Sequence, residues 1–201
     1  SVQEGEAELL SGMYFDRCGV AWSCFDPDDE WTGAAGPTSN GLERLVLAPY
    51  IQGERFVAHV RDRGRWAAVD ALHDSPPASA EQVIHPEKYP GERPTSVEVR
   101  DRSRANWEPL SRGRTGVNET GEDGVVGTAE SLGEAAINAM LAHGGVIDVG
   151  EELAYDHPIS AGWAGDALVP YRNESGAHGY VWQSEWDSVH DAEQFRSAYR
   201  E

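Results

Sequence analysis

Apolar residues recur every three or four positions over several stretches of the chain, and that spacing predicts helices. In the first stretch, residues 2–15, the apolar positions Val2, Leu9, Leu10, Met13 and Tyr14 fall mainly on one face. Further helices are expected at residues 42–48, 52–63, 65–75, 131–145 and 189–201, and a short one within 151–163. Pro49 separates the second helix from the third, because proline breaks the helical hydrogen-bond ladder.

The stretch Glu81–Pro90, EQVIHPEKYP, lies between the longer helices. Ser79, with Gln82 three residues later, has the pattern of a capping box. The segment SAEQVI is therefore expected to form a short helix that ends at His85, because the residue before a proline disfavours helical geometry. The stretch also gathers four ionisable side chains, Glu81, His85, Glu87 and Lys88, the last being the single lysine of the chain.

Alternating apolar and polar positions predict strands at residues 95–100 (TSVEVR), 167–172 (ALVPYR) and 179–186 (GYVWQSEW). The last two flank the turn-forming segment NESGAH and predict an antiparallel hairpin. Polar, Gly-rich stretches at about 26–41 and 101–130 are expected to be irregular loops. Together these patterns predict one domain over residues 1–201, of the α+β class and mainly helical, with a β-hairpin followed by a terminal helix capped by Asp187 or Ser188.

Acidic residues outnumber basic ones 35 to 16, are spread along the whole sequence, and give a net charge of −19. Spread acidity with almost no lysine favours a protein that folds in concentrated salt, where the screening length falls to about 3 Å at 1 M. An ordinary acidic protein is the alternative. The absence of a basic stripe argues against nucleic-acid binding. No run of 18 apolar residues exists, so no membrane span is expected.

The two cysteines, Cys18 and Cys24, lie close together in CGVAWSC and predict a disulfide that closes a small loop. No further ligands follow them at zinc-finger spacing. The sequons at Asn118 and Asn173 are typical of a glycosylated exterior protein. These features place the protein outside the cytoplasm, as an extracellular or cell-surface protein. No signal peptide is visible before the first predicted helix, so we expect the chain to be part of a longer protein.

Several segments carry a resemblance in collinear order: EGEA near the start, PYIQGERFVAHVRDRGRWAAVDAL, PPASAEQVIHPEKYPGERP, SLGEAAI, AGWAGDALVPY and VWQSEWDSVHDAEQF. Together they resemble a family of zincin-like proteins that includes many haloarchaeal cell-surface proteins and bacterial relatives. The CGVAWSC loop is particularly similar to the haloarchaeal surface branch. A halophilic source agrees with the excess of acidic residues and the single lysine, which had already favoured a protein that folds in concentrated salt.

The resemblance implies a metallopeptidase-type fold, in which a His-Glu-x-x-His helix binds zinc and its glutamate activates water. It also implies that Glu4, in QEGEA, is the acidic zinc ligand. The chain contains no His-Glu-x-x-His, so zinc is expected only together with an upstream segment. We therefore interpret the chain as the C-terminal portion of such a protein, whose partner is the missing N-terminal portion or another chain. A member of the family that has lost its catalytic half is the alternative.

Two roles are open for His85. By the resemblance, a histidine from this half can donate a hydrogen bond to a tetrahedral oxyanion. Alternatively, His85 and Glu87 satisfy backbone groups in the turn, while Lys88 pairs with a carboxylate and Tyr89 packs. In GWAGD, Trp163 and Asp166 are expected to be architectural, with Trp163 packed beneath the hairpin at a tight turn and Asp166 accepting backbone N–H groups.

Two functional hypotheses follow. The first is an extracellular, halophilic surface protein in which this chain is the C-terminal subdomain of a zincin-like metallopeptidase, inactive without the upstream segment and acting on peptides when complete. The second is a non-catalytic surface module for adhesion or for assembly with surface-layer components. Metal content and peptide hydrolysis at high salt discriminate between them.

Overall fold

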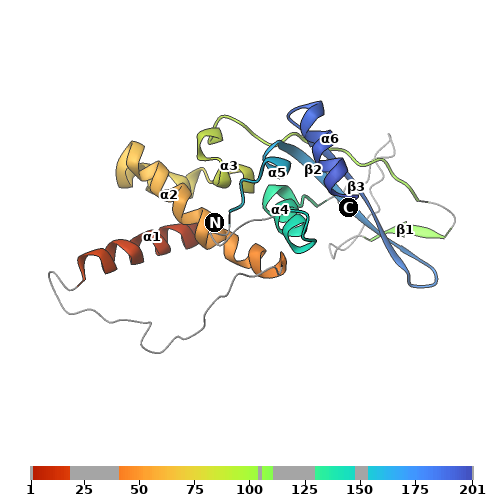
Figure 1. Ribbon diagram of the computed structural model, residues 1–201, viewed down its shortest axis with the longest axis horizontal. Coiled ribbons are helices and arrows are strands. Elements are labelled where there is room, and N and C mark those ends of the chain that lie inside the picture. The colour runs from red at the N-terminus through yellow and green to blue at the C-terminus, as the bar shows by residue number, and fades with distance from the viewer. Residues whose placement is uncertain (1, 19–40, 104–105, 111–129, 148–153, 201) are drawn as a thin grey trace.

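The computed structural model describes residues 2–18, 41–103, 106–110, 130–147 and 154–200. The α1–α2 helix pair forms one end of an elongated molecule and a small sheet forms the other, with α3, α4 and α5 between them (Figure 1). The helices are α1 (Val2–Arg17), α2 (Gly41–Asp74), α3 (Ala80–Ile84), α4 (Gly133–His143), α5 (Pro158–Ala161) and α6 (Val189–Ala198). A 3-10 turn, η2 (Pro86–Lys88), follows α3. The strands are β1 (Trp107–Pro109), β2 (Trp163–Asn173) and β3 (His178–Trp186).

The contact between α1 and α2 is close because two glycines meet where the helices approach each other. A Cβ atom on Gly5 would collide with the backbone of Gly53. Beyond this point the two helices bury one apolar cluster, which includes residues from the end of α2. The cluster consists of Val2, Leu9, Phe56, Val57, Val69 and Leu72. Burial of apolar surface of this kind contributes roughly 25 cal/mol per Å² to stability. The helix predicted over residues 2–15 is confirmed, but its predicted apolar face is only partly buried, since Leu10 is 47% exposed and Tyr14 41%.

The predicted break at Pro49 is wrong. Pro49 lies inside α2, which runs from Gly41 to Asp74. A proline in a helix interior removes one backbone hydrogen bond and costs about 3 kcal/mol, so the continuation of α2 through Pro49 goes against the rule on which the predicted break rested. The backbone instead departs from helical geometry at Arg65, whose φ is 59° and ψ is −166°. The long helix therefore kinks at the residue after Gly64, which agrees with the predicted separation of a helix over residues 52–63 from one over 65–75.

The sheet has three antiparallel strands in the order β1–β2–β3. The predicted hairpin is confirmed, and its register pairs Leu168 with Trp182 and Val169 with Val181. The strand predicted at 95–100 is wrong, since residues 95–99 belong to none of the described strands and only Arg100 forms a β-bridge. The strand that completes the sheet is β1, inside the stretch predicted to be irregular, with Trp107 opposite Asn173. Alternation alone could not separate a largely exposed segment, in which Val99 is buried, from a paired strand.

The start of β2 also differs in part from prediction, because only Gly162 of GWAGD lies in a turn, while Trp163–Asp166 form the beginning of a strand. A register irregularity falls between Trp163 and Gly165. A Cβ atom on Gly165 would collide with the carbonyl oxygen of Thr95, so the glycine allows the extended segment 95–100 to approach the strand. Thr95 N donates to the carbonyl of Ala164 at 2.7 Å.

A second apolar cluster joins α4, β2 and α6 and comprises Ile137, Leu141, Ala142, Ile147, Trp163, Phe195 and Ala198. Trp163 is buried there, as predicted, and Phe195 stacks on Trp186 with ring centroids 4.6 Å apart. The predicted caps are present: Ser79 Oγ accepts from Gln82 N, and Ser188 Oγ accepts from Asp191 N. The chain is therefore α+β and mainly helical, with a hairpin followed by a terminal helix. Among the described residues, no helix is long and apolar enough to span a membrane.

Candidate functional site

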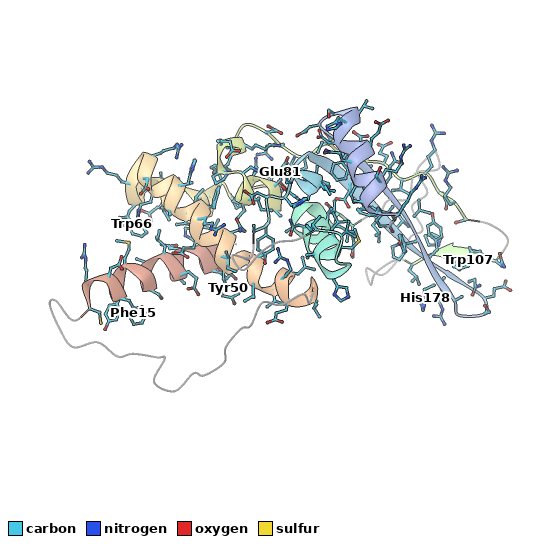
Figure 2. All side chains as sticks on the ribbon, in the orientation of Figure 1. Phe15, Tyr50, Trp66, Glu81, Trp107 and His178 are labelled. Carbon is cyan, nitrogen blue, oxygen red and sulfur yellow. The ribbon has the colours of Figure 1, made fainter. Side chains whose placement is uncertain are left out.

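The EQVIHPEKYP stretch folds as α3 followed directly by η2, and Figure 2 shows Glu81 in the middle of the molecule, between the helix pair and the sheet. Gln82 is 1% exposed and ties together the two ends of this segment. Ala78 N donates to its Oε1 at 2.6 Å, and its Nε2 donates to the carbonyl of Glu92. The short helix is thus held by its own side chains as well as by the cap at Ser79.

Lys88 lies at the centre of three carboxylates. Its Nζ is 2.6 Å from Glu81 Oε1, 3.0 Å from Glu92 Oε1 and 3.3 Å from Asp187 Oδ2. Burial lowers the pKa of Lys88, but the three carboxylates more than offset this effect and raise the pKa above its usual value. The ammonium is therefore charged, and it joins α3 to the segment that precedes α6.

His85 faces α4. Its Nε2 is 3.0 Å from Glu134 Oε1, and Glu134 is completely buried. Glu87 lies farther away, with 3.8 Å between its Oε1 and His85 Nδ1, and its side chain is 68% exposed. Burial raises the pKa of Glu134 to about 7, and the hydrogen bond to Glu134 raises the pKa of His85. The pair therefore holds a proton near neutral pH and links α3 to the first turn of α4.

Asp166 is the most heavily bonded carboxylate among the described residues. Both backbone N–H groups at the start of α4, those of Leu132 and Gly133, donate to it at 2.9 and 3.1 Å. The remaining donors are Ser131 Oγ, Trp163 Nε1 and Trp182 Nε1, at 2.7, 3.1 and 2.8 Å. A carboxylate at a helix N-terminus is stabilised by unpaired N–H groups and by the helix dipole. The predicted architectural role of Asp166 is confirmed, because it fastens α4 to the hairpin.

The described residues do not form a zinc site by themselves. Glu4 lies in the first turn of α1. The described residues contain one group of three or more candidate ligands whose atoms lie within 4.8 Å of one another, namely Glu81, Glu92 and Asp187. All three already contact the ammonium of Lys88, and neither Glu4 nor His85 belongs to the group. Zinc prefers four ligands that include histidine or cysteine. This set therefore does not fit the metal that the resemblance implies.

A cavity of about 510 Å³ lies between α1, α2, α3 and α4. Its walls are mainly apolar, and they include Val2, Leu45, Pro49, Leu72, Val83 and Ala135. The elements that carry Glu4 and His85 both border it, through Gln3 and Ile84 respectively, but neither ionisable residue lines it. Cavities of this size and character bind apolar groups of ligands.

Of the remaining predicted residues, Tyr89 has a packing role, and the roles of the others stay predictions. Tyr89 packs edge-on against Phe56 and donates its hydroxyl to Ser75 O at 2.5 Å. Asn173 Oδ1 accepts from Ser175 Oγ and Ala177 N in the hairpin turn, so use of this sequon for glycosylation stays a prediction. Asn118 and Cys24 lie outside the described residues, so that sequon and the pairing of Cys18 with Cys24 also stay predictions.

Sequence reasoning missed the partners of the predicted residues, above all Glu134. A signal was available, because Glu134, Ile137, Asn138 and Leu141 have the spacing of one helical face that includes core positions. Charged residues are almost never fully buried unless paired, so an acidic residue on that face indicates a partner. Asn138, on the same face, accepts from Arg44 Nη2 at 3.0 Å. Arg44 is itself buried, with its guanidinium 4.7 Å from the ring centroid of Tyr155.

Residues 123–201 match the family model of a domain of unknown function (DUF8575). The matched segment contains α4, the hairpin and α6, and with them Glu134 and Asp166. No curated protein and no solved structure matches the chain.

Proposed function

We propose that this chain is a non-hydrolytic binding module of an extracellular, salt-adapted surface protein, built like the C-terminal part of a zincin-like domain. One observation carries the proposal: the ionisable side chains of EQVIHPEKYP contact one another and internal partners, and none of them lines the cavity. His85 has its Nε2 against Glu134, and Lys88 is surrounded by carboxylates. Side chains in such positions stabilise the fold, and a substrate in the cavity would not meet them.

The extracellular and salt-adapted parts of the proposal rest on composition. A net charge of −19 with a single lysine suits a solvent in which salt screens self-repulsion. The zincin-like part rests on the resemblance of the quoted segments. Surface-layer components or another envelope protein are the expected partners of such a module.

A second candidate is a metallopeptidase subdomain completed by a segment that supplies His-Glu-x-x-His. A specific observation favours it, since the first turn of α1, with Glu4, and the end of α3, with His85, border the same cavity. In that arrangement a peptide side chain would occupy the cavity, and Glu4 would reach the metal from its rim. No step through zinc follows from this chain alone, because its own residues do not fit the site.

Hydrolysis of casein and of a quenched peptide in molar potassium chloride, with zinc added, tests the proposal. We expect no cleavage by the chain, and we expect His85→Ala to lower the melting temperature without changing the background rate. Cleavage that a chelator stops, and that a folded His85→Ala variant loses, would instead assign the chain to the peptidases.

A further inference from the structure

Residues 45–51 of α2 form two turns without a charged residue, yet none of their side chains is fully buried. The sequence from Leu45 to Ile51, LVLAPYI, contains no charged residue. Leu45 is 38% exposed, Val46 60% and Tyr50 43%, and Figure 2 labels Tyr50 on this part of the helix. A helix that is hydrophobic all round is normally covered by other elements, and a contiguous apolar patch rimmed by polar residues marks an interaction site. We name these three residues the α2 stripe.

The stripe continues the face of α2 that α1 covers. Positions seven apart lie on the same side of a helix, because seven residues make nearly two turns. Val46 is therefore aligned with Gly53, and Tyr50 with Val57. Gly53 meets Gly5 of α1, and Val57 is buried in the cluster with Val2 and Leu9. From Gly53 onward this face is covered by a helix, whereas over the preceding two turns no helix or strand of the described residues covers it.

The cavity adjoins the stripe on one side. Leu45 belongs to the stripe and also lines the cavity, together with Ala48 and Pro49. An apolar side chain that reaches over the stripe therefore finds a space of about 510 Å³ beside it. Interfaces commonly place an apolar anchor in such a pocket, surrounded by flatter contacts.

We propose that the α2 stripe binds an amphipathic helix of another protein, whose apolar face resembles that of α1 and which places one aliphatic side chain in the cavity. The helical spacing of the stripe matches recognition of a helix in a groove, read as anchors at i, i+3 or i+4 and i+7. The contact residues of α1, Val2, Gly5 and Leu9, show which pattern fits this face. The chain's net charge of −19 favours a partner with basic residues on its outer face, whereas a second copy would bring equal charges together.

This interface rests on the proposed function only in treating the chain as a binding module. The probe is a blocked synthetic helix with valine, glycine and leucine at the spacing of Val2, Gly5 and Leu9 and lysine on its outer face. Its fluorescence anisotropy is followed against the full chain in dilute and in molar potassium chloride. We expect saturable one-to-one binding, tighter in dilute salt.

Val46→Glu and Tyr50→Glu should each lower the affinity at least about tenfold, because a charge would have to enter an apolar contact. Val189→Glu is the matched control, since Val189 is 77% exposed on α6, and it should leave the affinity unchanged. Circular dichroism checks that all three variants fold.

The interface is overturned if the probe shows no saturable binding, or if it binds the stripe variants as well as wild type, in which case it displaces α1. It is also overturned if sedimentation shows a dimer of the chain that Val46→Glu dissociates, because the occupant is then a second copy. Peptide cleavage in the hydrolysis assay would overturn the proposed function and leave this binding result standing.

Discussion

Lys88 Nζ lies 2.6 Å from the carboxylate of Glu81, a residue that is 1% exposed and seven positions earlier in the chain. A buried carboxylate is costly unless a partner charge is held close to it. The single lysine of the chain thus occupies the position where a buried acidic residue needs a cation. The charged side chains of EQVIHPEKYP therefore anchor α3 to the segment that precedes α6.

Replacing Lys88 with methionine should destabilise the protein by about 3 kcal/mol, because removal of one partner leaves a buried carboxylate uncompensated. Urea unfolding at constant salt measures the change. The double variant Lys88→Met with Glu81→Gln should recover a large part of the loss. Arg61→Met is the control, since Arg61 pairs with Asp62, whose side chain is 68% exposed, and methionine keeps an apolar side chain beside Met13; it should cost less than about 1 kcal/mol. If Lys88→Met and Arg61→Met lowered the free energy of unfolding equally, Lys88 would be an ordinary surface residue.

The pair of His85 and Glu134 makes stability depend on pH. Burial raises the pKa of Glu134 from 4.5 to about 7, and the pKa of His85 is raised as well, so the folded state binds more protons than the unfolded state between about pH 5 and 8. Stability from this pair is present below that window and is lost as the pH rises through it. The loss should be on the order of 2 kcal/mol.

Glu134→Gln isolates this effect, because glutamine keeps a hydrogen-bonding group at the site without titrating. The free energy of unfolding of wild type minus that of Glu134→Gln should fall between pH 5 and pH 8. Measuring the difference removes the contribution of the many surface carboxylates. A difference that is flat or rises with pH would contradict the assigned protonation of the pair.

Asp166→Ala should destabilise the protein by about 4 kcal/mol, because it leaves several donors around the start of α4 without an acceptor. The fluorescence of Trp163 and Trp182 should change in the folded state, since both indole N–H groups lose their partner. Asp166→Asn keeps one acceptor oxygen and should lose roughly half as much. Asp62→Ala, at a largely exposed position, is the matched control. A small loss of stability in Asp166→Ala would mean that the hydrogen bonds to Asp166 contribute little to holding α4.

Gly5→Ala should cost about 2 kcal/mol or more, because a methyl group there collides with the backbone of Gly53 and overpacks the helix contact. Gly12→Ala is the matched control on the same helix, where the nearest atom to a new Cβ is Glu54 Oε1 at 3.9 Å. There the better helix propensity of alanine should stabilise by up to about 1 kcal/mol. Thermal unfolding followed at 222 nm, a helix wavelength, compares the two variants. Similar effects would show that α1 does not approach α2 closely.

Local signals in the sequence predicted much of the fold. Capping residues such as Ser79 and Ser188, the alternation of the hairpin and the period of α1 each depend on neighbours within a few positions. The predicted boundary between residues 63 and 65 coincides with the kink at Arg65, whereas the continuation of α2 through Pro49 and the pairing of β1 were not predictable in this way. Both depend on what packs against the segment, and propensity gives no access to those contacts.

Half of the candidate site could likewise be predicted from the sequence. The cluster of His85 and Lys88 drew attention from the sequence, and the resemblance suggested chemistry for it. Glu134 and Asp187 lie 49 and 99 positions from the residues they contact, so only the fold brings them together. Without those partners, a buried structural pair and a catalytic histidine look alike in the sequence.

Calorimetric titration of the full chain with zinc in molar potassium chloride tests most directly whether EQVIHPEKYP and Glu4 serve the fold and not metal chemistry. We predict no one-to-one binding, and wild type and Glu4→Gln should give the same trace, because Lys88 fills the acidic cluster and His85 is held by Glu134. One-to-one zinc binding that Glu4→Gln or His85→Ala abolishes in a folded protein would contradict this and identify the chain as a metal-binding subdomain.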